Sequence, residues 1–229
     1  MIGVIGAMES EVSSICAQMT EKETLNVKNY TFYKGKLFDK EIVLVKSGIG
    51  KVNAALCAQL LILHFNVSKV INTGIAGAIG SGLEIYDFVV STEAGYHDFD
   101  IRFFGYELGQ IPGLPKFFTA DEALVNAAVD SFNKSSLSKD HKITKGRVVS
   151  GDQFVDSKEV KNNIVKNFAP MCVEMEGAAI AHTCHLMNVP FVIVRCMSDT
   201  ADESVETSYS EDEASKISCT FLTELVKNL

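Results

Sequence analysis

The sequence lacks the cysteine spacing of a metal or redox motif. None of its cysteines forms a C-x-x-C pair, and most lie in apolar runs such as MCVEM (171–175) and VRCMSD (194–199). Buried, reduced thiols are therefore expected rather than disulfides or a zinc site. The pair His182 and His185 flanks a cysteine, but adjacent residues on a helix point in different directions, so no metal is predicted there. The six cysteines are Cys16, Cys57, Cys172, Cys184, Cys196 and Cys219.

Positive charge is scarce as well. The chain has 21 Lys and Arg residues and 29 Asp and Glu residues, which gives a net charge of −8. This balance argues against nucleic acid or an anionic membrane as the main partner. The opening stretch MIGVIGAMESEV has no basic residue, and Glu9 ends its apolar run well short of a signal or membrane-spanning segment. We therefore expect a cytoplasmic protein with no nucleic-acid or membrane partner.

Motifs of nucleotide-dependent and serine enzymes are also missing. The stretch SGIGKVN contains Gly50-Lys51, yet Val45 and Val52 occupy positions where a phosphate-binding P-loop needs Gly and Ser or Thr. Neither IGVIGAM nor NTGIAGAIGSG has the G-x-G-x-x-G spacing of a dinucleotide-binding fold, and no G-x-S-x-G occurs. A kinase, a Rossmann dehydrogenase and a serine hydrolase are therefore disfavoured.

What the sequence does contain is an alternation of short apolar runs and helical patterns. Several of the runs are continuously apolar, as in strands that are covered on both faces. The pattern predicts one α/β domain over residues 1–229, with a largely parallel central sheet and helices on both of its faces. The expected strands cover 2–7, 31–38, 41–48, 69–74, 87–94, 146–152, 171–176 and 191–199, and the expected helices cover 50–65, 121–132, 176–188 and 210–229.

Small and acidic residues gather where these strands end. Glu11 follows the first strand, Glu174 and Glu176 follow a later one, and Asp199 ends the apolar run FVIVRCMSD. Ligands of open α/β sheets bind at the carboxyl ends of the strands, so these acids are expected in one pocket. Burial should raise the pKa of Asp199, as a general acid requires. Converging carboxylates without a lysine cluster or metal-binding histidines indicate cleavage of a glycosidic bond.

The ordered set of motifs resembles the 5′-methylthioadenosine/S-adenosylhomocysteine nucleosidases, which belong to the nucleoside phosphorylase superfamily. The resemblance covers essentially the whole chain and implies a mixed, mostly parallel central sheet surrounded by helices. It also implies a homodimer that needs no metal and no organic cofactor. The motifs are IGAMESEV (5–12), KSGIGKVNAA (46–55), INTGIAGAI (71–79), YHDFD (96–100), FGYELGQIPG (104–113), SGDQFV (150–155), VEMEGAAIAHTC (173–184) and VPFVIVRCMSDTAD (189–202).

The resemblance implies roles for the acidic residues. Glu11 is expected to activate the attacking water, and Asp199 to protonate adenine N7. Glu176 resembles the carboxylate that holds the ribose 2′- and 3′-hydroxyls, with Met175 packed against the sugar. An ionised carboxylate accepts hydrogen bonds from vicinal hydroxyls and favours positive charge developing on the sugar. Glu174 and Arg195 also match pocket positions.

The resemblance also implies further contacts with the substrate. Phe154 matches the ring stacked on adenine, the backbone of Val155 reads the edge of the base, and Ser198 supports Asp199. The remaining matches are Met8, Ile49 and Tyr209 around the 5′-thioether, and Ile101, Phe104 and Pro112 contributed by the neighbouring subunit. Two positions depart from the family pattern: Ile75 stands where Ser is usual, and Tyr209 where Phe is usual.

Three alternatives remain from the sequence. A nucleoside phosphorylase would have to hold phosphate, which the acidic Glu11 and the apolar Ile75 disfavour. An adenosine-binding protein without activity would be expected to lack Glu11 or Asp199. A hydrolase acting on a modified futalosine would share the adenine and ribose contacts and differ at the 5′ end, which the sequence does not resolve.

Overall fold

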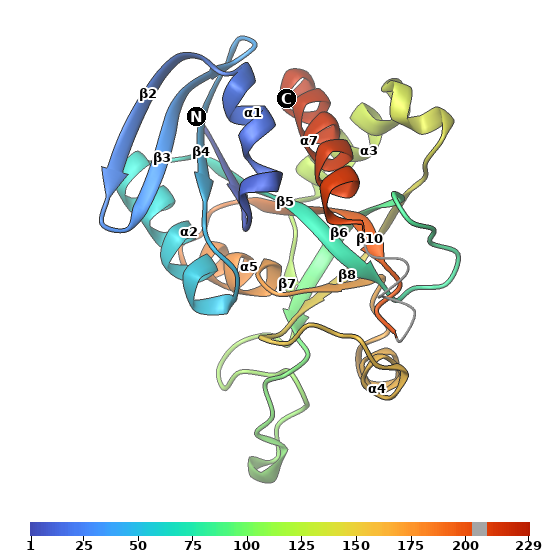
Figure 1. Ribbon diagram of the computed structural model, residues 1–229. Helices are drawn as coiled ribbons and strands as arrows, with labels where there is room; N and C mark the ends of the chain where they lie inside the picture. The colour runs from blue at the N-terminus through green and yellow to red at the C-terminus, as the bar shows by residue number, and fades with distance from the viewer. Residues whose placement is uncertain (203–209) are drawn as a thin grey trace.

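One mixed β-sheet organises the molecule in the computed structural model, which describes residues 1–202 and 210–229 (Figure 1). The strands are β1 (Ile2–Gly6), β2 (Thr20–Val27), β3 (Tyr30–Leu37), β4 (Lys40–Lys46), β5 (Lys69–Ala78), β6 (Phe88–Tyr96), β7 (Phe118–Thr119), β8 (Ile143–Ser150), β9 (Cys172–Glu174) and β10 (Phe191–Asp199). The helices are α1 (Ser13–Gln18), α2 (Lys51–Phe65), α3 (Glu122–Lys134), α4 (Lys158–Phe168), α5 (Gly177–Leu186) and α7 (Glu211–Asn228). Short 3-10 turns cover Glu9–Glu11 (η1), Arg102–Phe104 (η2) and Ser136–Lys139 (η3).

The strands run in the order β10-β6-β8-β9-β5-β1-β4-β3-β2, with β7 paired to β6. Because β10 also pairs with β5, the strands β5, β9, β8, β6 and β10 close into a ring, and β1, β4, β3 and β2 extend from it. Neighbours β4, β1, β5 and β10 are parallel, whereas β3 is antiparallel to both β2 and β4. The expected α/β class with a mixed sheet is therefore confirmed.

The apolar central strands are covered by helices on both sides. All five residues of β1 and all nine of β10 are buried. Helices α2 and α5 pack together on one side of the sheet, while α1, α3 and α7 lie on the other (Figure 1). Asp121 and Ser157 accept backbone N–H groups at the starts of α3 and α4, which fixes where these two helices begin. No helix in the described part of the chain is long and apolar enough to cross a membrane.

Several elements have no counterpart among the expected ones. Strand β2 (TEKETLNV) is mostly exposed and therefore lacks the apolar signal of a buried strand. Helix α4 (KEVKNNIVKNF) buries only Ile164 and Phe168. The segment between β6 and β7, which contains η2, projects from the body of the molecule (Figure 1). All six cysteines are free thiols, as expected.

Candidate active site

A cavity lies where β1, β5, β8, β9 and β10 end, and it collects most of the residues that the sequence singled out. Asp199 ends β10, Glu11 lies in the turn that follows β1, and Glu174 and Glu176 lie where β9 meets α5. The lining residues are Ala7, Met8, Glu11, Ile49, Ile75, Ala76, Gly77, Gln153, Phe154, Val155, Val173, Glu174, Met175, Glu176, Ser198 and Asp199.

Glu11 is held by backbone amides at the end of β1. Its Oε2 accepts the N–H groups of Ala7 (2.6 Å) and Met8 (3.0 Å), and its Oε1 accepts the N–H of Ile75 (3.0 Å). Burial raises the pKa of this carboxyl, while nearby Arg195 and the three amides oppose the rise. Glu11 is thus a fixed, buried carboxyl in the cavity wall.

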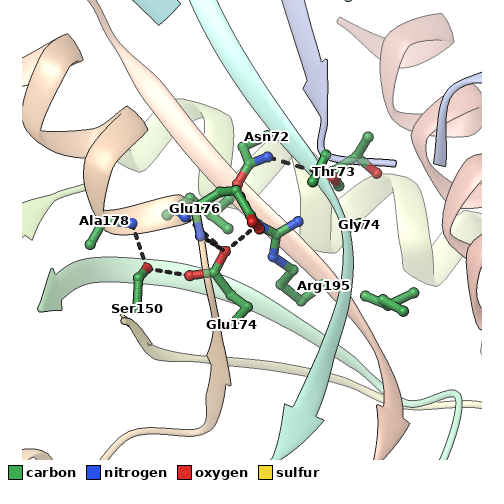
Figure 2. Close-up of polar contacts among 12 residues, drawn as sticks. Asn72, Thr73, Gly74, Ser150, Glu174, Glu176, Ala178 and Arg195 are labelled. Carbon is green, nitrogen blue, oxygen red and sulfur yellow. Dashed lines mark hydrogen bonds and ion pairs between the residues drawn. The ribbon is translucent and has the colours of Figure 1, made fainter. Parts of the chain in front are cut away.

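The carboxylate of Glu174 is bound within the protein, where it accepts hydrogen bonds from Ser150 and Arg195 (Figure 2). Its Oε2 accepts the N–H groups of Glu176 (3.0 Å) and Gly177 (2.7 Å) at the start of α5, and it forms a buried ion pair with Arg195. Arg195 also donates to Asn72 Oδ1 at 2.7 Å, and its Nε and Nη1 have no partner among the described residues. Glu174 therefore joins β9, β10 and the first turn of α5.

Glu176 faces the cavity with fewer partners. Its Oε1 accepts the N–H of Gly50 at 2.8 Å, and its Oε2 lies 3.8 Å from Arg195 Nη2. Burial, assisted by the negative charge of Glu174, raises the pKa of the Glu176 carboxyl to about 7, against the opposing charge of Arg195. Because Gly50 occupies one oxygen, the other remains available to a polar ligand.

Asp199 sits at a bulge where β10 pairs with β5. The register shifts between Met197 and Asp199, which places Asp199 opposite Gly77. Its Oδ1 accepts the N–H of Ala201 and its Oδ2 accepts the hydroxyl of Ser198, both at 2.8 Å. Burial raises the pKa of Asp199, although both hydrogen bonds oppose the rise. The carboxyl is oriented by two donors and is easier to keep protonated than an exposed aspartic acid.

The other predicted pocket residues divide into three groups. Met8, Ile49, Phe154, Val155, Met175 and Ser198 line the cavity, with the side chains of Ile49 and Phe154 half exposed at its mouth. Ile101, Phe104 and Pro112 lie outside it, on the segment between β6 and β7. Tyr209 falls outside the residues that the structure describes.

Three residues that bind the carboxylates or Arg195 of this site were not predicted from the sequence. Gly50 contributes a backbone N–H, which no side-chain pattern reveals. Asn72 is a fully buried polar residue inside an apolar strand, and this contrast was a usable signal. Ser150 ends β8 and accepts the N–H of Ala178 while donating to Glu174.

Known proteins match the chain over its whole length. The model of the phosphorylase superfamily matches residues 1–227. The 5′-methylthioadenosine/S-adenosylhomocysteine nucleosidase of Staphylococcus haemolyticus is 43% identical over 232 residues, covering 100% of both chains. The solved nucleosidase of the same name from Neisseria meningitidis, in complex with methylthio-immucillin-A, has a TM-score of 0.95 at 41% identity and covers 100% of this chain and 99% of its own.

A differently named protein is similar too. The native structure of futalosine hydrolase from Helicobacter pylori has a TM-score of 0.93 at 35% identity, and the match covers 100% of this chain and 97% of that one. By sequence and by fold, the chain belongs to the phosphorylase superfamily and, within it, to the family of 5′-methylthioadenosine/S-adenosylhomocysteine nucleosidases.

Proposed function

We propose that this protein hydrolyses the N-glycosidic bond of 5′-methylthioadenosine and S-adenosylhomocysteine, releasing adenine and the 5-thio-substituted ribose. The observation that carries the proposal is the placement of Glu11, Glu176 and Asp199 around one cavity, each held by at least one backbone N–H group. Relatives over the full length are named for this activity. Cleavage of such a bond needs an acid for the leaving group, a base for water, and support for an oxocarbenium-like sugar.

Asp199 is the proposed general acid. Its raised pKa keeps a proton on the carboxyl at a higher pH than an exposed aspartic acid allows. Ser198 and the N–H of Ala201 fix its orientation, so the proton is directed toward N7 of a bound adenine. Protonation of the base makes it a neutral leaving group when the bond to the sugar breaks.

Glu11 is the proposed base for the attacking water. Three backbone amides hold its carboxylate, so it needs no reorganisation when it accepts the proton. Gly74 allows Glu11 to lie against Arg195, since a side chain at Gly74 would overlap Glu11 Oε1 and Arg195 Nη1. The unpartnered Nη1 donor therefore lies close to the proposed base.

Glu176 is the proposed ligand of the ribose hydroxyls, with Met175 against the sugar. The oxygen that Gly50 leaves open accepts a hydroxyl, and the charge favours the cationic sugar of the transition state. Phe154 provides the stacking surface for adenine, beside the backbone of Val155. Met8 and Ile49 form the apolar wall for the 5′-thio group, and Tyr209 is proposed to complete it.

Water is the proposed nucleophile rather than phosphate. Phosphate binding requires cations and hydroxyl donors, whereas this side of the cavity presents the Glu11 carboxylate and the apolar side chain of Ile75. The serine hydroxyl that is usual at position 75 in the family is replaced by the apolar side chain of Ile75. The backbone N–H of Ile75 still donates to Glu11 at 3.0 Å.

A homodimer with shared pockets completes the proposal. Helix α2 exposes Val52 (70%) and Leu56 (49%), and the projecting segment exposes Phe103 (93%) and Phe104 (71%). Large apolar side chains that are exposed together are typical of a protein interface. We assign a second copy of the chain as its occupant, with Ile101, Phe104 and Pro112 reaching the neighbouring cavity. The six free thiols fit the reducing cytoplasm, where we place the reaction.

The test is adenine release from 5′-methylthioadenosine by the purified protein, with and without phosphate, and with identification of the sugar. Equal rates and free methylthioribose are expected. Dependence on phosphate with a sugar 1-phosphate as product would instead identify a phosphorylase. A parallel assay with a modified futalosine tests the second candidate, which the similarity to a futalosine hydrolase favours. Activity only on that compound would overturn the substrate assignment.

A further inference from the structure

Three charged residues lie just outside the cavity and form a connected group, which we call the Lys51 network (Lys51, Asp98 and Asp152). Lys51 is the first residue of α2, Asp98 follows β6, and Asp152 follows β8. Lys51 Nζ donates to Asp98 Oδ2 at 2.6 Å and lies 3.6 Å from Asp152 Oδ2. None of the three lines the cavity.

Backbone groups take part in the same network. Asp152 Oδ1 accepts the N–H of Lys51 at 2.9 Å, and the N–H of Asp152 donates to Asp98 Oδ2 at 2.9 Å. Each member thus contacts the other two, and Asp98 and Lys51 are each only 24% exposed in their side chains. Burial tends to raise the pKa of Asp98, but the hydrogen bonds from Lys51 and Asp152 outweigh it and hold the pKa below its usual value.

Each of the two loops that the network joins carries residues that line the cavity. The loop before α2 contains Ile49 and Gly50, and the N–H of Gly50 holds Glu176. The loop after β8 contains Phe154 and Val155. Its base is packed closely, because a side chain at Gly151 would overlap the buried ring of His97.

We infer that the Lys51 network is a positioning device that fixes the loop of Phe154 and Val155 against the first turn of α2. It thereby holds the adenine-facing and ribose-facing walls of the cavity at their correct separation. The three residues touch no reacting atom and act through Gly50, Glu176, Phe154 and Val155. The role in turnover rests on the proposed function, whereas the tethering of the two loops does not.

The consequence is an effect on binding rather than on the chemical step. If the network is broken, the two loops lose their tie, and substrate must order them when it binds. Glu11 and Asp199, the proposed base and acid, are held by other segments, so the change should appear mainly in KM and much less in kcat. Loss of charge-assisted hydrogen bonds between partly buried groups is expected to raise KM by about tenfold.

The experiment compares Lys51→Met and Asp98→Asn with the wild type, and Lys36→Met is the matched control. Lys36 also forms an ion pair, at 2.8 Å with Glu21, but on the β2–β3 hairpin away from the cavity. The primary readout is amide hydrogen exchange in segments 48–52 and 151–155, which does not depend on activity. Exchange should accelerate about tenfold or more in the two network variants, remain unchanged in the control, and be largely restored by Lys51→Arg.

Kinetics and assembly provide the second readout. KM for 5′-methylthioadenosine should rise about tenfold with kcat within about twofold of the wild type. Because Lys51 also borders the proposed dimer surface, sedimentation must show an unchanged oligomeric state, and Asp98→Asn must reproduce the result. Unchanged exchange, or a loss confined to kcat, would overturn the positioning role. If the wild type releases no adenine, the proposed function fails, while the exchange data still decide whether the network ties the loops.

Discussion

Four carboxylates line one cavity, and they differ in their hydrogen-bond partners. They are those of Glu11, Glu174, Glu176 and Asp199. Glu174 is bound by Arg195, Ser150 and two amides of α5, so its oxygens are occupied within the protein. The carboxyl groups of Glu176 and Asp199 line the cavity and can still form hydrogen bonds with a ligand. Burial raises the pKa of both groups. Residue type alone does not assign such roles; the partners of each oxygen do.

The sharpest test at this scale is Asp199→Asn. The amide still accepts the N–H of Ala201, so the fold should persist with a thermal midpoint close to that of the wild type. Loss of the proton donor should lower kcat by about 10²–10⁴-fold while adenine binding is retained. Adenine release and calorimetric titration measure these two effects. Asp130→Asn, at an exposed position on α3, serves as the control. Near-normal turnover in Asp199→Asn would refute the general-acid role.

The raised pKa of Glu176 also predicts how stability changes with pH. Between the ordinary value of 4.5 and about 7, the folded protein keeps a proton that the unfolded chain releases. The free energy of unfolding therefore falls as pH rises through this window, by up to about 3 kcal/mol from this one group. Glu176→Gln should remove that part of the decline. Urea unfolding at pH 5 and pH 8 measures it, with exposed Glu23→Gln as the control; an equal decline in both variants would contradict the assignment.

At the scale of elements, the pairing of β5 with β10 sets the position of Asp199, the proposed general acid. A Cβ at Gly77 would lie 2.8 Å from both Asp199 Oδ1 and the Cβ of Ala201, which is too close for real atoms. Gly77→Ala should therefore displace the carboxyl and reduce kcat by about tenfold or more, since a small misplacement of a catalytic group is costly. Steady-state kinetics together with a thermal melt test this. A stable variant with unchanged kcat would mean that Asp199 tolerates displacement.

The elements that the sequence predicted are those with a strong burial signal. Strand β10 was expected at 191–199 and β4 at 41–48, because their apolar residues are buried by helices on both sides. Strand β2 was missed because it lies at the sheet edge and is stabilised by pairing with β3 rather than by burial. Helix α4 was missed for a similar reason, since its exposed face is rich in asparagine and lysine.

The candidate site, too, was predicted only in part. Glu11, Glu176 and Asp199 were found because acids that follow apolar strands converge at one edge of an α/β sheet. The amide of Gly50 and the Lys51 network were not found, since they depend on how three loops meet in space. Local pattern therefore predicts which strand a residue follows, whereas contacts between loops require the folded structure.

At the scale of the whole molecule, the chain exposes an apolar surface that includes an uncovered depression. Val52 and Ala55 from α2, with Phe99 and Ile111 from the projecting segment, border this depression. The depression adjoins Lys51 and so lies next to the loop that holds Glu176. A second copy bound here would cover the apolar surface and also reach the mouth of the cavity. Dimer formation would then be required for full activity.

Complementation between two impaired variants decides whether the pockets are shared. Phe104→Ala should lower kcat/KM by about tenfold if Phe104 completes the partner's cavity. Co-expression of Phe104→Ala with Asp199→Asn then creates mixed dimers, in which one of the two sites has both an intact Asp199 and an intact Phe104 from the partner. Random pairing gives about a quarter of the wild-type number of complete sites.

Activity that rises to about this fraction in the co-expressed protein, measured as adenine release at low substrate, would establish the shared site. The control is simple mixing of the two purified variants under conditions where subunits do not exchange, which should show only the sum of their separate activities. If the co-expressed protein also gives only that sum, Phe104 acts within its own subunit or not at all.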